Sequence, residues 1–439
     1  VGILKACGSI GAIEKGEQFH DMMDRNNWLK KDIVLCTTLV DMYAKCGMLA
    51  KAQEVLDELA VRNVVTWSAM IAGYAVQGQL NEALKCFKQM QSEGLSPNEI
   101  TFACMLKACG NVGAIGNGIE IHDEILRRGL LKHNVVLGNA LIDMYTTCGV
   151  VMKAREVHNE LVLRDVVSWS ALIAGYTQQG HAHEAINCFE QMQGECICPN
   201  AVTFLSILKA CGSIGAIDKG KEIHNLISNK GLLKKDVMLG TAVVDMYAKC
   251  GVLEKAHQVL EGLPIRNVFS WSALIAGYAQ QGQGHKAMRC FEHMQGEGLF
   301  PDEVTFLCVL NACTHSGLLD DAQTYFQSMS KYYGITPSLE HHTCMAVSLG
   351  CIGHFDKVIS MIKTMPSSSY LPVWRALLSA CQRWGNVKLG SLAFDQAMQL
   401  DDSSSSSYIL MANLYAASGM QEDAESIEAM RRKMMVGRI

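Results

Sequence analysis

The sequence of this 439-residue chain repeats itself with a period of 102 residues. The phrase Leu4-Lys-Ala-Cys7 returns as Leu106-Lys-Ala-Cys109 and as Leu208-Lys-Ala-Cys211. A tryptophan keeps the same spacing, at Trp67, Trp169 and Trp271. Self-similarity at a fixed spacing is typical of repeat architectures, so the chain is predicted to be an array of stacked units.

Each period divides into three related segments of 35, 36 and 31 residues. Their opening phrases are similar, as in Val65-Thr-Trp-Ser-Ala-Met, Ile100-Thr-Phe-Ala-Cys-Met and Val136-Leu-Gly-Asn-Ala-Leu. The sequence therefore predicts eleven segments, the first of them incomplete at its start, followed by a divergent tail. The segments are 1–32, 33–63, 64–98, 99–134, 135–165, 166–200, 201–236, 237–267, 268–302, 303–338 and 339–370, and the tail is 371–439.

The pattern within a segment is helical. Apolar residues fall at i, i+3, i+4 and i+7 in Trp169–Tyr176 and again in Glu184–Met192, which predicts two amphipathic helices. Gln179-Gly180 lies between them and suits a helix end followed by a turn. A hairpin of about 35 residues cannot bury its apolar faces alone. We therefore predict an all-α superhelical solenoid of helix-turn-helix hairpins, with the tryptophans in its core and one concave face.

Composition argues against several other classes of protein. The chain is 49% hydrophobic and 18% charged, which excludes a disordered chain. No stretch is long and apolar enough for a membrane helix. The net charge of -5 argues against a protein that holds duplex DNA by neutralising its phosphates. Neither a membrane nor DNA is therefore an expected partner.

The cysteines and histidines give no metal site. The chain has 18 Cys but no Cys-x-x-Cys pair, so the periodic cysteines are predicted to be small packing residues. His122-Asp-Glu124 matches half of a zinc deaminase signature whose cysteine half is absent, and His20 and His224 are its repeat counterparts, so His122 is predicted to be part of the scaffold. His341 and His342 are expected at the surface. We expect no catalytic residue, no metal and no cofactor.

The segments resemble a known family. The phrase Val-Val-Ser-Trp-Ser-Ala-Leu-Ile-Ala-Gly-Tyr176 and the alternating lengths resemble pentatricopeptide repeats of the plant organellar type that mixes P, long (L) and short (S) motifs. In that scheme the eleven segments run L, S, P in order from the partial L repeat 1–32 to the S repeat 339–370. The tail, with Val373–Cys381, Gly385–Gly390 and Tyr408–Gly419, resembles the paired E-type extension motifs of RNA editing factors.

The resemblance implies that the chain reads single-stranded RNA with one base per repeat. In this family the fifth residue of a repeat and its last residue select the base. The implied pairs are Thr37 with Asn63, Ser68 with Asn98, Asn139 with Asp165, Ser170 with Asn200, Thr241 with Asn267, and Ser272 with Asp302. The family code then gives 5'-AANUANAGN-3', where N lies under the L repeats. In the last S repeat, Thr343 is paired with Tyr370, which implies at most a weak purine preference.

Two further sets of residues are candidates for RNA contact. By the resemblance, the apolar second residues sandwich the bases, and these are Val34, Val65, Val136, Val167, Met238 and Phe269. Lys5, Lys107 and Lys209 lie one helical turn after the fifth position, on the same face, and are candidate phosphate contacts.

The resemblance also implies a biological role. We expect the chain to position an organellar transcript for C-to-U editing, in a mitochondrion or chloroplast. The chain itself is then not an enzyme, and a cytidine deaminase would follow beyond Ile439 or act in trans, with 371–439 as the segment that docks a deaminase or another editing partner. Two alternatives stay open: a helical-repeat scaffold that binds a peptide, and an organellar RNA stability or translation factor.

Overall fold

The computed structural model describes residues 1–26, 28, 32–59, 61–132, 134–365, 370–402 and 405–436. These residues form helices and the turns between them, without a strand. The predicted all-α fold is confirmed, and the last three residues of the predicted tail lie outside the described ranges. No helix within those ranges is long and apolar enough to cross a membrane.

The chain divides into two compact units, Val1–Ala210 and Cys211–Ile439. The helices of the first unit are α1 (Gly2–Ile10), α2 (Ile13–Arg25), α3 (Ile33–Lys45), α4 (Leu49–Glu58), α5 (Val64–Val76), α6 (Leu80–Ser92), α7 (Glu99–Val112), α8 (Ile115–Arg127), α9 (Val135–Thr147), α10 (Val151–Glu160), α11 (Val166–Gln178) and α12 (Ala182–Gly194). Helix α13 (Ala201–Ile214) contains the boundary between the units.

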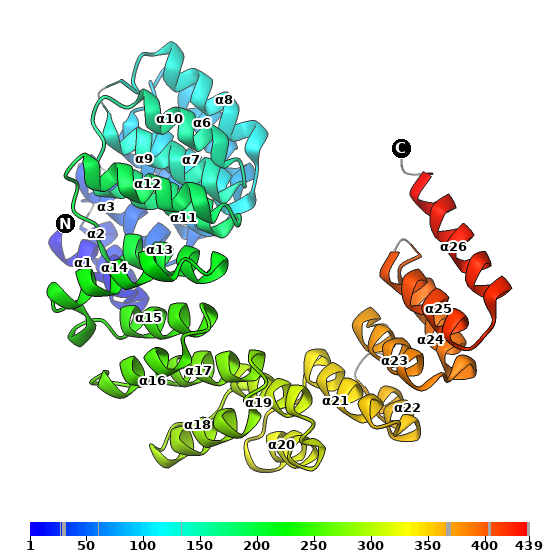
Figure 1. Cartoon of the computed structure of the whole chain (residues 1–439). Helices are drawn as coiled ribbons and strands as arrows, with labels where there is room; N and C mark the ends of the chain where they lie inside the picture. The colour runs from blue at the N-terminus through cyan, green and yellow to red at the C-terminus, as the bar shows by residue number, and fades with distance from the viewer. Residues whose placement is uncertain are drawn as a thin grey trace. The chain divides into compact units, whose positions relative to one another are not determined.

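The helices of the second unit continue the same alternation (Figure 1). They are α14 (Ile217–Asn229), the short 3-10 helix η1 (Leu232–Lys234), α15 (Val237–Lys249), α16 (Leu253–Gly262), α17 (Val268–Gln280), α18 (Gly284–Gly296), α19 (Glu303–Ser316), α20 (Leu319–Tyr332), α21 (Leu339–Cys351) and α22 (Phe355–Thr364). The tail forms α23 (Leu371–Trp384), α24 (Val387–Leu400), α25 (Ser405–Ala417) and α26 (Gln421–Val436).

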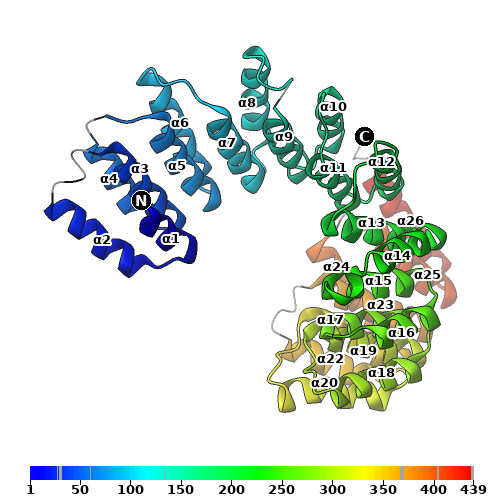
Figure 2. The same ribbon diagram turned by 90° about the vertical axis from the view of Figure 1, so that its left-hand side faces the viewer.

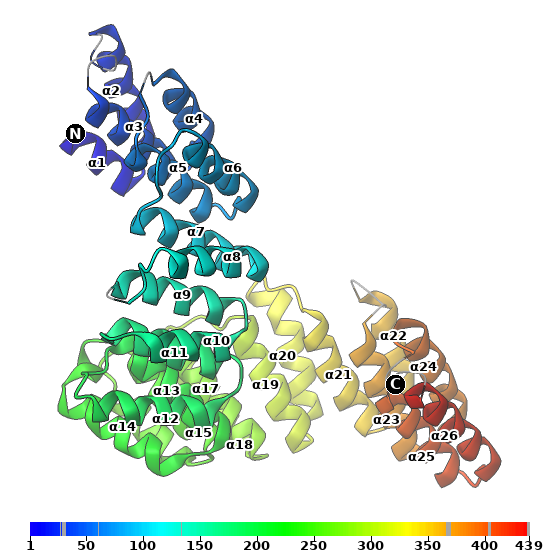
Figure 3. The same cartoon turned by 90° about the horizontal axis from the view of Figure 1, so that it is seen from above.

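The helices form two layers within each unit. Odd-numbered helices pack side by side, from α1 through α11 in the first unit and from α15 through α25 in the second. Each even-numbered helix packs against a neighbouring odd-numbered helix, and most of them, such as α4, α6 and α18, pack against both the helix before and the helix after, so they cover one side of the odd-numbered layer. Figure 2 shows this for α3 to α6, and Figure 3 shows the two tail hairpins. The other side of the odd-numbered layer is left open.

The predicted turn after the first helix is confirmed. Gly78, Gly180 and Gly282 have φ values of 68°, 79° and 68°, in the left-handed region. A glycine adopts this conformation without a steric penalty, and it ends the helix so that the chain can reverse. The Gln-Gly dipeptide therefore sets the length of the first helix in each P repeat.

The predicted core residues are buried. Trp67, Trp169 and Trp271 are at most 3% exposed. The cysteines of the Lys-Ala-Cys phrase are also buried, and burial raises the pKa of Cys109 and Cys211 to about 12. Such thiols stay protonated at neutral pH, which suits packing residues and not nucleophiles or metal ligands.

The predicted surface position of the two adjacent histidines is wrong. His341 is 2% exposed and His342 is 8% exposed. The Nδ1 atom of His341 lies 2.7 Å from the hydroxyl of Ser338, and its Nε2 lies 2.9 Å from the carbonyl oxygen of Glu303. His341 is the third residue of α21, where several other repeats have Ser or Thr, and its Nδ1 accepts the backbone N–H of the N-cap residue Ser338 at 3.2 Å, so the imidazole completes a capping box.

Candidate nucleic-acid interface

A groove on the open side of the odd-numbered layer contains several of the predicted RNA-contacting residues together. It has a volume of about 700 Å³ and is lined by residues of α1, α3, α5 and α7 and by the N-cap residues of α5 and α7. The residues named from the sequence that line it are Lys5, Val34, Thr37, Asn63, Val65, Ser68 and Asn98. Base-selecting, base-sandwiching and phosphate-contacting candidates of adjacent repeats therefore share one surface.

The last residue of each P or S repeat is the N-cap of the next helix. In six of them, the side-chain Oδ1 accepts the backbone N–H of the third helical residue at 2.8 to 2.9 Å, and these are Asn63, Asn98, Asp165, Asn200, Asn267 and Asp302. Asn and Asp are preferred at N-caps for this reason. The cap fixes Oδ1 toward the helix, so the second terminal atom is Nδ2, a donor, in Asn and Oδ2, an acceptor, in Asp.

The fifth-position serines of the P repeats are buried. Ser68, Ser170 and Ser272 are only 4 to 5% exposed. Their hydroxyls lie 2.7 to 2.8 Å from the hydroxyls of Thr101, Thr203 and Thr305, respectively. Those threonines are the third residues of the following L repeats. They were not predicted from the sequence, because the spacing within one repeat does not reveal a contact with the next.

The fifth-position threonines of the S repeats are half-buried. Thr37, Thr241 and Thr343 each donate a hydrogen bond to the carbonyl oxygen four residues earlier, at 2.7, 3.0 and 2.9 Å. Thr241 also lies 3.3 Å from Oδ1 of Asn267. This back-bonding occupies the hydroxyl proton and leaves an oxygen lone pair for another donor.

Asn139 differs from the other fifth-position residues. Its Nδ2 donates to Oδ1 and Oδ2 of Asp165, at 3.3 Å each. Its Oδ1 is buried and has no hydrogen-bond partner among the described residues. A buried acceptor without a donor is costly, and it is a natural place for a donor from a ligand.

The second-position residues are exposed apolar side chains in both units. Val34, Val65, Val136 and Val167 in the first unit are 51 to 62% exposed, and Met238 and Phe269 in the second unit are 66% and 65% exposed. The equivalent residues of the L repeats were not among the predicted RNA contacts. Ile100, Val202 and Val304 are 53 to 63% exposed, and their position as second residues of their segments was the signal that identifies them.

The three candidate phosphate-contacting lysines are exposed, but the surface around them is not purely basic. Lys107 pairs with Asp143 at 3.1 Å. In the groove that Lys5 lines, Lys45 pairs with Asp41 at 2.7 Å. These exposed pairs contribute little to stability. They mean that a bound phosphate competes with a carboxylate of the protein for the same ammonium group.

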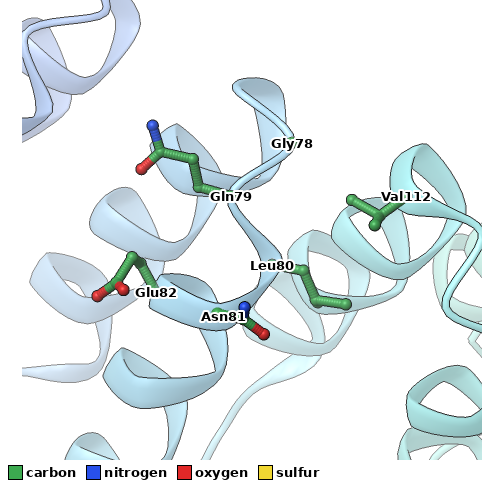
Figure 4. Close-up of a pocket in the computed structure, with 6 residues that line it drawn as sticks. All are labelled: Gly78, Gln79, Leu80, Asn81, Glu82 and Val112. Carbon is green, nitrogen blue, oxygen red and sulfur yellow. The ribbon is translucent and has the colours of Figure 1, made fainter.

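A second pocket lies at the other end of the hairpin, away from the groove. It has a volume of about 320 Å³ and is formed by the turn at Gly78, the start of α6 and Val112 (Figure 4). Its one carboxylate, Glu82, pairs with Lys85. The described part of the chain contains no cluster of three or more metal-ligating side chains.

The chain matches models of a known repeat family. The model of the PPR repeat family matches residues 62–111, 164–213 and 266–315. The PPR repeat model matches residues 34–64 and 304–332, and the E motif model matches residues 384–437.

Similar proteins include two pentatricopeptide repeat-containing proteins of Arabidopsis thaliana. One, named as mitochondrial, is 36% identical over 431 residues, which cover 98% of this chain and 76% of the relative. The other is 38% identical over 437 residues, covering 99% of this chain and 77% of the relative. Among solved structures, the pentatricopeptide repeat protein PPR10 in complex with an 18-nucleotide psaJ RNA element has a TM-score of 0.74 at 17% identity, with 92% of this chain and 61% of that chain covered.

Proposed function

This chain belongs to the pentatricopeptide repeat family and ends in an E-type motif, and we propose that its repeats bind single-stranded RNA with one base per repeat. The observation that carries the proposal is the groove where Thr37, Asn63, Ser68 and Asn98 lie beside the exposed Val65. The PPR10 structure with bound RNA has the same fold, which supports the proposal.

The proposed base preferences follow from the side-chain atoms that the N-cap hydrogen bonds do not use. A serine lone pair beside the Nδ2 donor of Asn98 fits the edge of adenine, which offers an amino donor next to a ring-nitrogen acceptor. A serine lone pair beside Oδ2 of Asp302 fits guanine, which offers two N–H donors. The buried Oδ1 of Asn139 fits the N3–H of uracil. These assignments support the sequence 5'-AANUANAGN-3', with the bases read on their Watson–Crick edges.

The exposed second-position residues supply the apolar part of the proposed interface. A base held between two such side chains of adjacent repeats loses apolar surface to water on both faces. Stacking on aromatic side chains contributes roughly 1 to 3 kcal/mol per base, and aliphatic side chains contribute less. Because Ile100, Val202 and Val304 are exposed like the others, the bases under the L repeats are proposed to stack without being selected.

We further propose that the chain positions an organellar transcript for C-to-U editing. The support is the E motif at 384–437 and the relative named as mitochondrial. The chain spans about three quarters of the two Arabidopsis relatives and 61% of the PPR10 chain. The deaminase is proposed to come from sequence outside this chain or from a partner that docks on the tail. Loss of editing at one cytidine in a knockout, with transcript abundance unchanged, would separate this role from RNA stabilisation.

RNA binding is tested by fluorescence anisotropy with a labelled 5'-AANUANAGN-3' oligonucleotide. A scrambled RNA of the same composition and the DNA of the same sequence are the controls, at two salt concentrations. We expect tight, salt-weakened binding to the first RNA alone. Equal binding to the scrambled RNA would contradict the base assignments. No binding to any oligonucleotide would contradict RNA binding and favour a groove that holds a peptide.

A further inference from the structure

A buried hydroxyl connects the two base-selecting residues of every P repeat. Thr101 is fully buried, and its Oγ1 lies 2.7 Å from the Ser68 hydroxyl and 2.9 Å from Oδ1 of Asn98. Thr101 belongs to the following L repeat, so the base-selecting pair of one repeat is joined through a residue of the next. Equivalent contacts are made by Thr203, with Ser170 and Asn200, and by Thr305, with Ser272 and Asp302.

The direction of these hydrogen bonds follows from counting protons. Oδ1 of Asp302 is a carboxylate oxygen, so Thr305 donates its one hydroxyl proton to it, at 2.7 Å. Ser272 then donates to Thr305, at 2.8 Å. In the first P repeat, Oδ1 of Asn98 accepts the Thr101 N–H at 2.9 Å, which fixes the orientation of the amide and makes Thr101 a donor again.

The network therefore decides which atoms face a ligand. The serine proton points inward, so the serine offers a lone pair. The closing side chain is held by two hydrogen bonds through Oδ1, so Asn98 offers Nδ2 and Asp302 offers Oδ2. Ser170 shares its proton with the carbonyl oxygen of Val166, at 2.6 Å, and offers a lone pair in the same way.

The junctions between S and P repeats are built differently. The hydroxyls of Thr66, Ser168 and Ser270 occupy the same third position and are fully buried, but each donates to the backbone carbonyl of the N-cap residue, at 2.7 to 2.9 Å. They complete a capping box and do not touch the closing side chain with the hydroxyl. Among these six third-position hydroxyls, only those of the L repeats also bond to the closing side chain of the repeat before.

From this contrast we infer that Thr101, Thr203 and Thr305 are positioning residues that set the base preference of the P repeat before them. The inference rests on the proposed RNA binding by the repeats. Each threonine orients the serine as an acceptor and the closing residue as a donor or an acceptor, without contacting the base. Base selection in a P repeat thus depends on three residues, one of which lies in the next repeat.

The test replaces the hydroxyl by a methyl group of similar size. Thr101→Val removes the network at the second base, and Thr66→Val removes a capping hydroxyl of equal burial that does not touch a base-selecting side chain. Binding of both variants and of the unaltered chain is measured with 5'-AANUANAGN-3' and with RNAs that carry G, C or U at the second base. Thermal unfolding followed by circular dichroism checks that the variants fold. Thr305→Val is the second variant of the network, and its preference for guanine is measured at the eighth base.

We expect Thr101→Val to lower the preference for adenine at the second base roughly tenfold, in the range that one base-edge contact contributes. The first base stays selected, Thr66→Val keeps both preferences, and Thr101→Ser restores the second. Full adenine preference in Thr101→Val, or an equal loss in Thr66→Val, would overturn the inference while RNA binding stands. If the unaltered chain prefers no base at either position, the proposed base selection fails and the inference fails with it.

Discussion

The side-chain amide of Asn139 donates its Nδ2 hydrogens to both carboxylate oxygens of Asp165, 3.3 Å away, and its own Oδ1 is buried with no donor among the residues that the structure describes. These two residues are the fifth and the last residue of one S repeat, the positions proposed to select its base. Their contact orients the amide, since only Nδ2 can donate to a carboxylate. The repeat therefore presents the Oδ1 acceptor of Asn139 in a fixed orientation.

Asn139→Ser should change the base preference of this repeat from uracil to guanine. The variant pair, Ser with Asp165, matches Ser272 with Asp302, where both side chains offer acceptors. Binding to RNA with uracil at the fourth base should weaken by about 1 to 3 kcal/mol. Anisotropy titrations with the four RNAs that differ at that base measure the change. An unchanged preference for uracil would mean that the assigned register is wrong.

Asp143→Asn should strengthen RNA binding, and Lys107→Gln should weaken it. The carboxylate of Asp143 lies 3.1 Å from Lys107 and competes with a phosphate for that ammonium group. Loss of one phosphate contact should also reduce the slope of log K against log salt by about 0.7. Titrations at four salt concentrations test this. Lys85→Gln is the control, because Lys85 lies on α6 in the covering layer and pairs with Glu82, so its loss should leave both affinity and slope unchanged.

The sequence predicts the fold well because the repeats, the helices and the turns each have a pattern of residues that lie close together in the chain. The 102-residue period, the apolar spacing around Trp169 and the Gln-Gly turns all depend on residues close together in the chain. The helical hairpins and the buried tryptophans followed from them. The burial of His341 did not, since it depends on a carbonyl oxygen of Glu303, 38 residues earlier.

The candidate site is predictable in part for the same reason. Within one repeat the fifth, last and second positions can be named from spacing and family resemblance, and the groove holds several of them together. Contacts between side chains of different repeats could not be predicted in this way. An example is Thr101, whose partner Ser68 is 33 residues away. The capping role of Asn63 and its equivalents was also not predicted, because the same side chain caps a helix and is proposed to contact the ligand.

Cys196→Gly should stabilise the first unit. Cys196 has a φ of 58°, in the left-handed region, where the equivalent repeats have Gly94 and Gly298 at 77° and 78°. A side chain costs about 1 kcal/mol in this conformation, and glycine avoids that cost. Urea unfolding followed by circular dichroism should show a higher midpoint for Cys196→Gly. Cys198→Ser, a change at a second exposed cysteine, should leave the midpoint unchanged, and an equal gain there would point to thiol chemistry instead of backbone strain.

His158→Leu should make the stability of the first unit less dependent on pH. His158 is 1% exposed, and neither of its ring nitrogens has a hydrogen-bond partner within the described ranges. Burial, helped by the nearby Arg164 and Arg155, lowers its pKa to about 4. The equivalent positions in the other periods hold Leu56 and Leu260, both fully buried, so leucine fits this space.

The direction of the pH effect follows from the protons bound. In the unfolded chain this histidine has its ordinary pKa of about 6.5, so between pH 6.5 and 4 only the unfolded chain takes up the proton. Stability is therefore complete above pH 6.5 and falls as the pH drops, by about 2 kcal/mol at pH 5. Urea unfolding at pH 7.5 and pH 5 should show this loss in the unaltered chain and a smaller loss in His158→Leu. Equal losses in the two proteins would show that His158 is not the group that titrates.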